Sequence, residues 1–128
     1  MSRIDPLGVP RSAMNVGAAA EQATADYLVA SGYTILHRNK RFGHLELDIV
    51  ARLGGVVAVV EVRARGPGAY ERPFESIAPA KRERIRKATD MLWRGLKADE
   101  SIERIRLDAA AVTFNESGAH VEYIEGAI

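Results

Sequence analysis

Residues 45–63, with the sequence LELDIVARLGGVVAVVEVR, decide the fold of this chain. Apolar and polar side chains alternate over residues 45–52, and residues 56–63 are rich in β-branched valine, so both segments favour β-strands. The Gly54-Gly55 dipeptide between them suits the positive φ angles of a two-residue turn. The sequence therefore predicts a β-hairpin. The apolar positions of its first strand, which we expect on one face, are Leu45, Leu47 and Ile49.

The two-residue turn also predicts which side chains face each other across the hairpin. Counting outward from Gly54-Gly55 places Asp48 opposite Glu61 and Glu46 opposite Arg63. Opposed side chains on antiparallel strands have Cβ atoms about 4.5–5.5 Å apart. Because side chains alternate with a period of two, all four charged residues are expected on one face of the sheet.

Two facing carboxylates repel each other and are costly on a half-buried sheet. A hard divalent cation resolves this conflict, because aspartate and glutamate oxygens suit Mg²⁺ or Mn²⁺. In the other interpretation this face is exposed to solvent, and Arg63 neutralises Glu46 and Glu61. The spacing of the residues leaves both interpretations open.

The remainder of the chain predicts a single α/β domain. Its 128 residues, 47% of them hydrophobic, are enough for one core. Periodicity and turn residues predict helices over residues 15–31 and 78–97, and further strands over residues 33–38, 104–114 and 120–124. We expect residues 1–12 to form a flexible arm before a domain of residues 13–128, and residues 66–73 to form a loop.

The composition narrows the classes of function. The chain has no cysteine, which excludes disulfides and thiolate metal sites. No segment resembles a signal peptide or approaches the roughly 20 apolar residues that span a bilayer, so we expect a cytoplasmic protein with no membrane partner. The net charge is only +1, so any binding of nucleic acid must depend on a local patch.

A candidate for such a patch lies at the start of the second predicted helix. Its cations are Lys81, Arg82, Arg84, Arg86 and Lys87. Basic side chains along a groove neutralise phosphates without reading the base sequence. A run of charges on a helix is also typical of an ordinary solvated face. Beside a metal-binding face in the same domain, we favour phosphate binding by Lys81, Arg82, Arg84 and Lys87.

An ordered set of residues spans nearly the whole chain from about Gly17 onward. The set comprises Gly17 and Glu21, LELDIVA at residues 45–51, VEVR at residues 60–63 with Arg65, residues 73–77 leading to Lys81 and Arg84-Ile85, and Arg106-Leu107-Asp108. In this set the chain resembles the YraN-like bacterial proteins, relatives of archaeal Holliday-junction resolvases in the PD-(D/E)XK nuclease superfamily. The resemblance implies a restriction-endonuclease-like core, with a mixed sheet of about five strands flanked by two main helices.

The resemblance also implies roles for individual residues. Asp48 corresponds to the first metal-binding aspartate and Glu61 to the acidic residue of the (D/E)XK element, which together would hold Mg²⁺ or Mn²⁺ weakly. Glu21 corresponds to a further catalytic ligand that some members supply from the preceding helix. Glu46 is expected to support the site. Judged without the resemblance, Glu21 is an ordinary solvated carboxylate.

The chain departs from the family pattern at Arg63, where lysine is expected. Arginine keeps the positive charge but does not release its proton at working pH. If Arg63 stabilises charge in the transition state, the resemblance implies a metal-dependent endonuclease that acts on DNA, including branched DNA, and that is a homodimer as resolvase-like relatives are. If Arg63 only pairs with Glu61 or Glu46, the protein is an inactive module that binds nucleic acid or protein.

Overall fold

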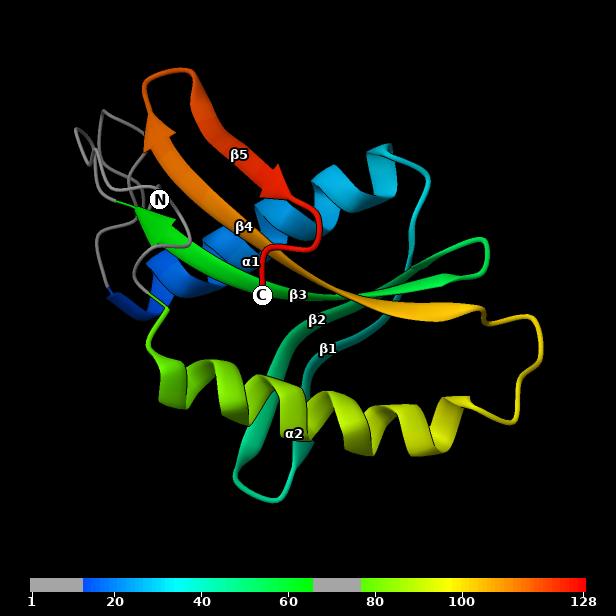
Figure 1. Ribbon diagram of the computed structural model, residues 1–128. Coiled ribbons are helices and arrows are strands. Elements are labelled where there is room, and N and C mark those ends of the chain that lie inside the picture. Colours follow the sequence, from blue (N-terminus) through cyan, green and yellow to red (C-terminus); the bar gives the residue numbers. More distant parts are fainter. Residues whose placement is uncertain (1–12, 66–76) are drawn as a thin grey trace.

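The structure is a computed structural model that describes residues 13–65 and 77–128. Its elements follow the predicted order of one helix, three strands, one helix and two strands (Figure 1). They are α1 (Ala13–Ala30), β1 (Thr34–Phe42), β2 (Leu45–Leu53), β3 (Val56–Arg65), α2 (Pro79–Leu96), β4 (Arg104–Asn115) and β5 (Gly118–Ile124). The expected arm of residues 1–12 and the expected loop of residues 66–73 lie outside the described residues.

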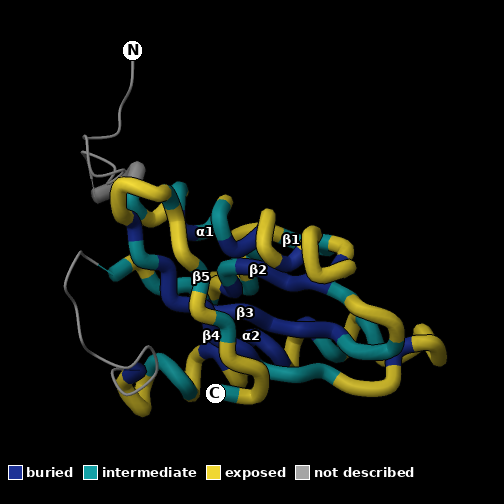
Figure 2. Tube along the Cα trace, turned by 90° about the horizontal axis from the view of Figure 1, so that it is seen from above, coloured by how far each residue is buried: buried dark blue, intermediate teal, exposed yellow. Residues whose placement is uncertain are grey.

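The five strands form one mixed sheet in the order β1-β2-β3-β4-β5. Strands β3 and β4 pair in parallel, and the other neighbours are antiparallel. Parallel neighbours need a long crossover, and the segment that contains α2 provides it. Helix α1 packs on one face of the sheet and α2 on the other (Figures 1 and 2). This arrangement confirms the prediction of a mixed α/β domain with two main helices.

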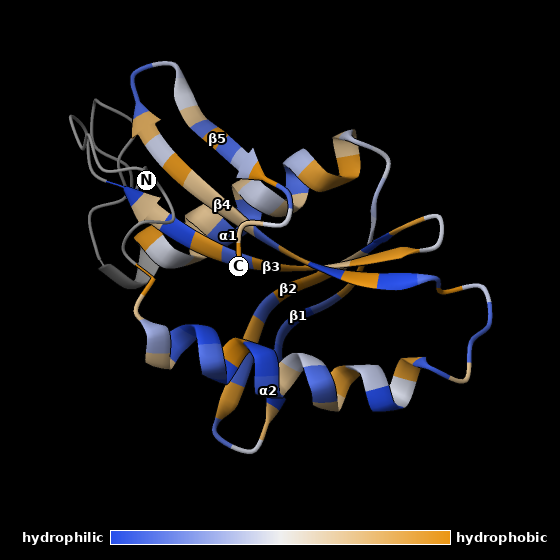
Figure 3. Ribbon diagram, in the orientation of Figure 1, coloured by the Kyte–Doolittle hydropathy of each residue, from blue (hydrophilic) through white to orange (hydrophobic). Residues whose placement is uncertain are grey.

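The hydrophobic core has one half on each face of the sheet. Buried residues of the α1 half include Ala25, Leu28, Ile49, Ala58 and Val60. Those of the α2 half include Val50, Val57, Val59, Ile85, Ala88 and Leu92. Because β3 is covered on both faces, its first half is a continuous apolar run rather than an alternating one (Figure 3).

The register of the β2–β3 hairpin is the predicted one. The paired residues run from Leu53 and Val56 beside the turn to Ile49 and Val60. Gly54 has a φ of 58°, as the turn requires. The Gly55 carbonyl accepts the backbone N–H groups of Glu103 and Arg104, which holds the turn against the start of β4.

The predicted alternation along β2 fails at Asp48. Leu47 packs in the α2 half of the core and Ile49 in the α1 half, so these two side chains do not share a face. The two strands diverge here: the pairing of β2 with β3 ends at Ile49, whereas its pairing with β1 continues to Leu45. Beyond that point the β1–β2 hairpin curves past α2 (Figure 1), and its leucines turn towards that helix.

The bend has a counterpart on β1. Asn39 lies between the paired residues Arg38 and Lys40, at the level of Asp48 on β2. Among the described residues it is the only one other than glycine with a positive φ, at 52°. Such a conformation is uncommon outside glycine, although asparagine tolerates it better than most residues. The hairpin therefore changes direction at Asn39 and Asp48 together, and β1 extends to Phe42 rather than ending at Arg38.

The remaining element boundaries differ little from those predicted. Helix α1 begins at Ala13 rather than at Asn15, and α2 covers Pro79–Leu96 within the predicted 78–97. Strand β5 begins at Gly118 rather than at His120. No helix in the described part of the chain is long and apolar enough to cross a membrane.

A buried polar network fixes the C-terminal end of the chain. Asp108 on β4 is fully buried. Its carboxylate accepts hydrogen bonds from the Arg106 guanidinium, the Tyr123 hydroxyl and the Gly126 backbone N–H. Arg106 also donates to the Tyr33 hydroxyl, so residues from β4, β5 and the α1–β1 connection meet there. Every described contact of Asp108 is internal, which marks this carboxylate as a structural one.

Candidate functional site

A hollow of about 230 Å³ lies between the diverging β1–β2 hairpin, β3 and the first half of α2. The residues that line it are His44, Leu45, Glu46, Asp48, Glu61, Lys81, Arg84 and Ile85. We call these residues the candidate site. The separation of β2 from β3 opens this space, and α2 closes it from the other side.

Asp48 and Glu61 form the acidic centre of the candidate site. They directly follow the last paired residues, Ile49 and Val60, on the two diverging strands, and both line the hollow. The Asp48 carboxylate accepts the backbone N–H of Val62 at 2.9 Å, which satisfies a donor at the point where β2 leaves β3. Glu61 is only 5% exposed. The predicted convergence of two carboxylates on one face is therefore present.

The surroundings of Asp48 oppose its ionisation. Burial, followed by the negative charge of Glu61, raises the pKa of the Asp48 carboxyl to about 7, although the Val62 N–H acts in the opposite direction. The neutral form of this carboxyl is thus favoured to a much higher pH than that of an ordinary aspartate. A nearby cation would favour the ionised form and remove the conflict between the two acids.

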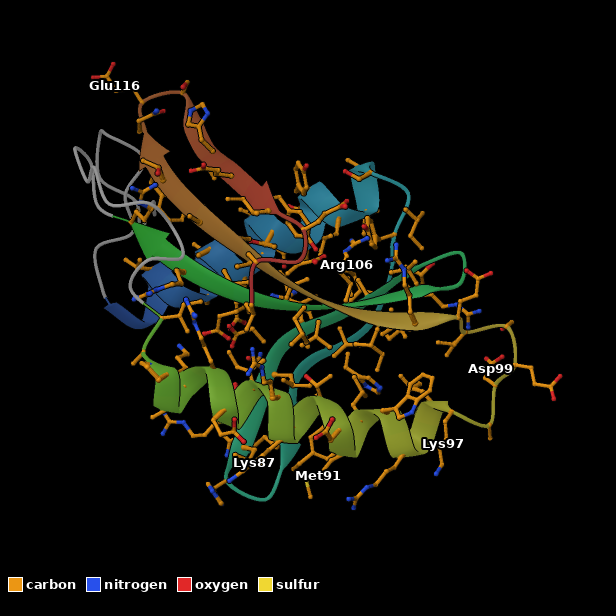
Figure 4. The ribbon with its side chains drawn as sticks, in the orientation of Figure 1. Lys87, Met91, Lys97, Asp99, Arg106 and Glu116 are labelled. Atoms are coloured by element: carbon orange, nitrogen blue, oxygen red, sulfur yellow. The ribbon has the colours of Figure 1, made fainter. Side chains whose placement is uncertain are left out.

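Such a cation is present in α2. The Nζ atom of Lys81 lies 2.5 Å from Oε1 of Glu61. Lys81 precedes the buried residue Ile85 by one helical turn, so both lie on the side of α2 that faces the sheet. The four predicted phosphate-binding residues are consequently divided: Lys81 and Arg84 line the hollow, whereas Arg82 is half-buried outside its lining and Lys87 is exposed on the outer side of α2 (Figure 4).

Glu21 lies outside this lining. Its carboxylate accepts a hydrogen bond from the side-chain amide of Asn39 at 3.2 Å, across the contact between α1 and β1. Burial raises the pKa of Glu21, and the negative charges of Asp48 and Glu46 act in the same direction. Among the described residues, no three histidine, cysteine, aspartate or glutamate side chains are grouped to hold a metal ion. The expected set of three carboxylate ligands is therefore not grouped among the described residues, although the charge of Asp48 acts on Glu21.

Comparison with known proteins identifies the family. Residues 20–112, which include all these acidic residues, match the model of the uncharacterised protein family UPF0102. The chain belongs to the UPF0102 family. A UPF0102 protein of Sorangium cellulosum is 49% identical over 114 residues, which cover 88% of this chain and 79% of that protein. One of Bacteroides fragilis is 36% identical over 88% of this chain and 90% of its own length. One of Oleidesulfovibrio alaskensis is 43% identical, but the match spans only 47% of that protein.

The predicted pairing of Glu46 with Arg63 is wrong for this UPF0102 chain. Glu46 lies opposite Arg41 of β1, and its carboxylate forms an ion pair with that guanidinium at 3.2 Å. Arg63 lies on β3 in register with Ala111 of β4. Because β2 diverges from β3, the expected group of four charged residues on one face reduces to the Asp48–Glu61 pair, with Lys81 beside it.

The sequence patterns missed one residue of this UPF0102 site and one residue next to it. His44 lies in the turn between β1 and β2, and it reaches the hollow because the hairpin bends towards α2. No local pattern indicates that bend. Asn39 positions Glu21 and was also missed. The sheet-facing position of Lys81 could have been found, because it extends the stripe of Ile85, Ala88 and Leu92 by one turn.

Proposed function

We propose that this UPF0102 protein is a metal-dependent, nuclease-like protein that binds DNA. The observation that carries the proposal is the pair of facing carboxylates, Asp48 and Glu61, in a hollow that also receives Lys81 and Arg84. The order of helices and strands is compatible with the restriction-endonuclease-like arrangement that the resemblance implies. Acidic groups beside cations in one hollow suit a substrate whose phosphates are brought to a metal ion.

The donor set suits a hard divalent cation. Magnesium is commonly held by one or two carboxylates, with water and substrate phosphates completing its octahedron. Asp48 and Glu61 would supply the two carboxylates, and Glu21 would act on the metal electrostatically from its position beside Asn39. When bound, Mg²⁺ or Mn²⁺ supplies the means to polarise a phosphodiester and activate a water molecule.

The cations of the chain would bind and orient the substrate. Arg84 lines the hollow and is exposed, so its guanidinium can contact a phosphate without losing a buried partner. Arg63, which follows Glu61 by two residues on β3 and lies outside the lining of the hollow, would act as a fixed positive charge on the substrate, because arginine stays protonated at working pH. The exposed Lys87 would add a sequence-independent contact on the outer side of α2.

A second candidate function follows from the presence of arginine at position 63. In it the protein keeps the fold and binds nucleic acid, but lacks cleavage. The two functions share the DNA-binding residues and differ in whether the Asp48–Glu61 pair supports a reaction. Cleavage assays separate them, whereas binding assays do not.

The test compares the wild type with Asp48→Asn and with Asp90→Asn, a matched control for an exposed aspartate on α2. Calorimetry with Mn²⁺ should show binding by the wild type and by Asp90→Asn, and much weaker binding by Asp48→Asn. Four-way junction and linear duplex DNA of the same sequences are then incubated with Mg²⁺. Cleavage lost in Asp48→Asn supports a nuclease, and metal binding without cleavage supports the inactive module. Equal Mn²⁺ affinity for all three proteins would contradict the metal site.

A further inference from the structure

Helix α2 directs one of its basic side chains at the acidic centre of the site. Lys81 lies on the side of α2 that faces the sheet, one turn before Ile85. Further along the helix, Ile85, Ala88 and Leu92 are buried on this same side. An apolar residue would be the ordinary choice there. Instead the side chain ends in an ammonium group in contact with Glu61. A buried carboxylate explains this choice, since an unpaired charge at Glu61 would be costly.

We propose that Lys81 is the internal counter-ion of the Asp48–Glu61 pair, which a divalent cation displaces and which then binds a phosphate oxygen of the substrate. The inference rests on the proposed function, because it assigns the metal to the same two carboxylates. It gives Lys81 a role that the exposed cations of α2 do not share.

The two partners of this ion pair differ in their freedom to move. The Lys81 side chain is 44% exposed, whereas that of Glu61 is 6% exposed. The backbone of Lys81 is held by α2, which is anchored by its buried stripe. The ammonium group sits on a flexible four-carbon stem. When the contact breaks, the lysine head can therefore turn towards the opening of the hollow, while the carboxylate stays in place to meet a metal ion.

The balance of charge favours this exchange. Lys81 by itself balances the charge of only one carboxylate, Glu61, whereas a divalent cation neutralises two ionised carboxylates. Glu46 does not change this balance, because Arg41 already pairs with it. With the metal bound, the charge of Lys81 is surplus and attracts the negative phosphodiester. Lys81 therefore pairs with Glu61 when no metal is bound and contacts the substrate when the metal is bound.

This exchange would also supply a lysine that β3 lacks. The family pattern expects lysine two residues after Glu61, where this chain has Arg63. A point charge on a flexible stem can change partners, whereas the larger planar guanidinium favours fixed bidentate contacts. Lys81 reaches the same carboxylate from the opposite wall of the hollow.

The experiment uses Lys81→Met, which keeps the length of the stem and removes the charge, and Lys97→Met as the control. Lys97 is exposed at the end of α2, far from the hollow (Figure 4). Mn²⁺ affinity is measured by calorimetry, and DNA affinity by fluorescence anisotropy with Mn²⁺ and with EDTA. Lys81→Gln is measured alongside, and thermal melting establishes that each variant folds.

Lys81→Met should bind Mn²⁺ roughly tenfold more tightly than the wild type, because no ammonium competes for Glu61. It should bind DNA more weakly than the wild type in Mn²⁺ but equally in EDTA, and Lys97→Met should change neither metal affinity nor this difference. Unchanged or weaker Mn²⁺ binding by both Lys81 variants would overturn the inference. A difference in DNA affinity between the wild type and Lys81→Met that is the same in Mn²⁺ and in EDTA would also overturn it. Failure of the metal site itself is seen separately, as equal Mn²⁺ affinity of the wild type and Asp48→Asn.

Discussion

Asp48 accepts the backbone N–H of Val62 at 2.9 Å, at the level where β2 separates from β3. A side chain thereby satisfies a donor that the neighbouring strand no longer reaches. The same contact aims the Asp48 carboxyl at β3, where Glu61 is the residue before Val62. The acidic pair is thus a consequence of how the sheet opens, and its chemistry follows from its burial.

Stability should depend on pH through Asp48. Its folded-state pKa, about 7, lies above the ordinary value of 3.8, so the folded protein binds the proton more tightly than the unfolded chain. The associated stabilisation is complete below the ordinary pKa and is lost as pH rises through 7. In EDTA, the free energy of unfolding of the wild type should therefore fall relative to that of Asp48→Asn between pH 5 and pH 8, by at most about 1.4 kcal/mol per pH unit.

Urea denaturation at several pH values measures this difference directly. Added Mg²⁺ should reverse the trend, because it binds the ionised pair. If the free energy of unfolding changes with pH in the same way for the wild type and for Asp48→Asn in EDTA, the proton on Asp48 contributes nothing to folding.

Asp108 should be essential for folding rather than for metal binding. Replacing it by alanine leaves the Arg106 guanidinium, only 15% exposed, without its main partner. Breaking a buried charge pair in this way costs about 3–5 kcal/mol. Chemical denaturation of Asp108→Ala should show that loss, whereas Glu125→Ala, which removes an exposed partner of Arg106, should cost much less. Similar stability of the two variants would mean that the network is not the anchor of the C-terminal segment.

DNA binding should depend on salt through Arg84. If its guanidinium contacts one phosphate, Arg84→Gln should reduce the slope of log affinity against log salt concentration by about 1, with little change in preference among DNA sequences. Arg104→Gln, at the start of β4 and outside the hollow lining, is the matched control. Equal slopes for the wild type and Arg84→Gln would place Arg84 on an ordinary solvated face.

The two proposed functions differ in how they depend on Arg63. If it serves a nuclease as a fixed cation, Arg63→Lys should keep or raise cleavage of branched DNA, and Arg63→Ala should abolish it. If the site is inactive because lysine is missing, the wild type should not cleave, and Arg63→Lys should restore some activity. If Arg63→Ala cleaves DNA at the wild-type rate, Arg63 neither assists cleavage nor prevents it.

The fold could be predicted because its decisive signals are local. Gly54-Gly55 set the hairpin register, and the valine run identified a strand covered on both faces. The pairing of Glu46 could not be predicted, since alternation along β2 does not say whether β1 or β3 lies opposite. The bend at Asn39 and Asp48 depends on both neighbouring strands and on the packing of α2. The charge of Lys81 predicts phosphate contacts, whereas its spacing from Ile85 indicates the sheet-facing side of α2.

The most direct test of the acidic centre is a titration with paramagnetic Mn²⁺ followed by NMR. A metal ion held by Asp48 and Glu61 should broaden the backbone amide signals of Asp48, Glu61 and Val62 first. The signals of Asp99 and Glu116, which lie at far ends of the molecule (Figure 4), should stay sharp at the same Mn²⁺ concentration. Asp48→Asn should remove the selective broadening. Broadening that begins elsewhere, or that is unchanged in Asp48→Asn, would contradict a metal site at this pair.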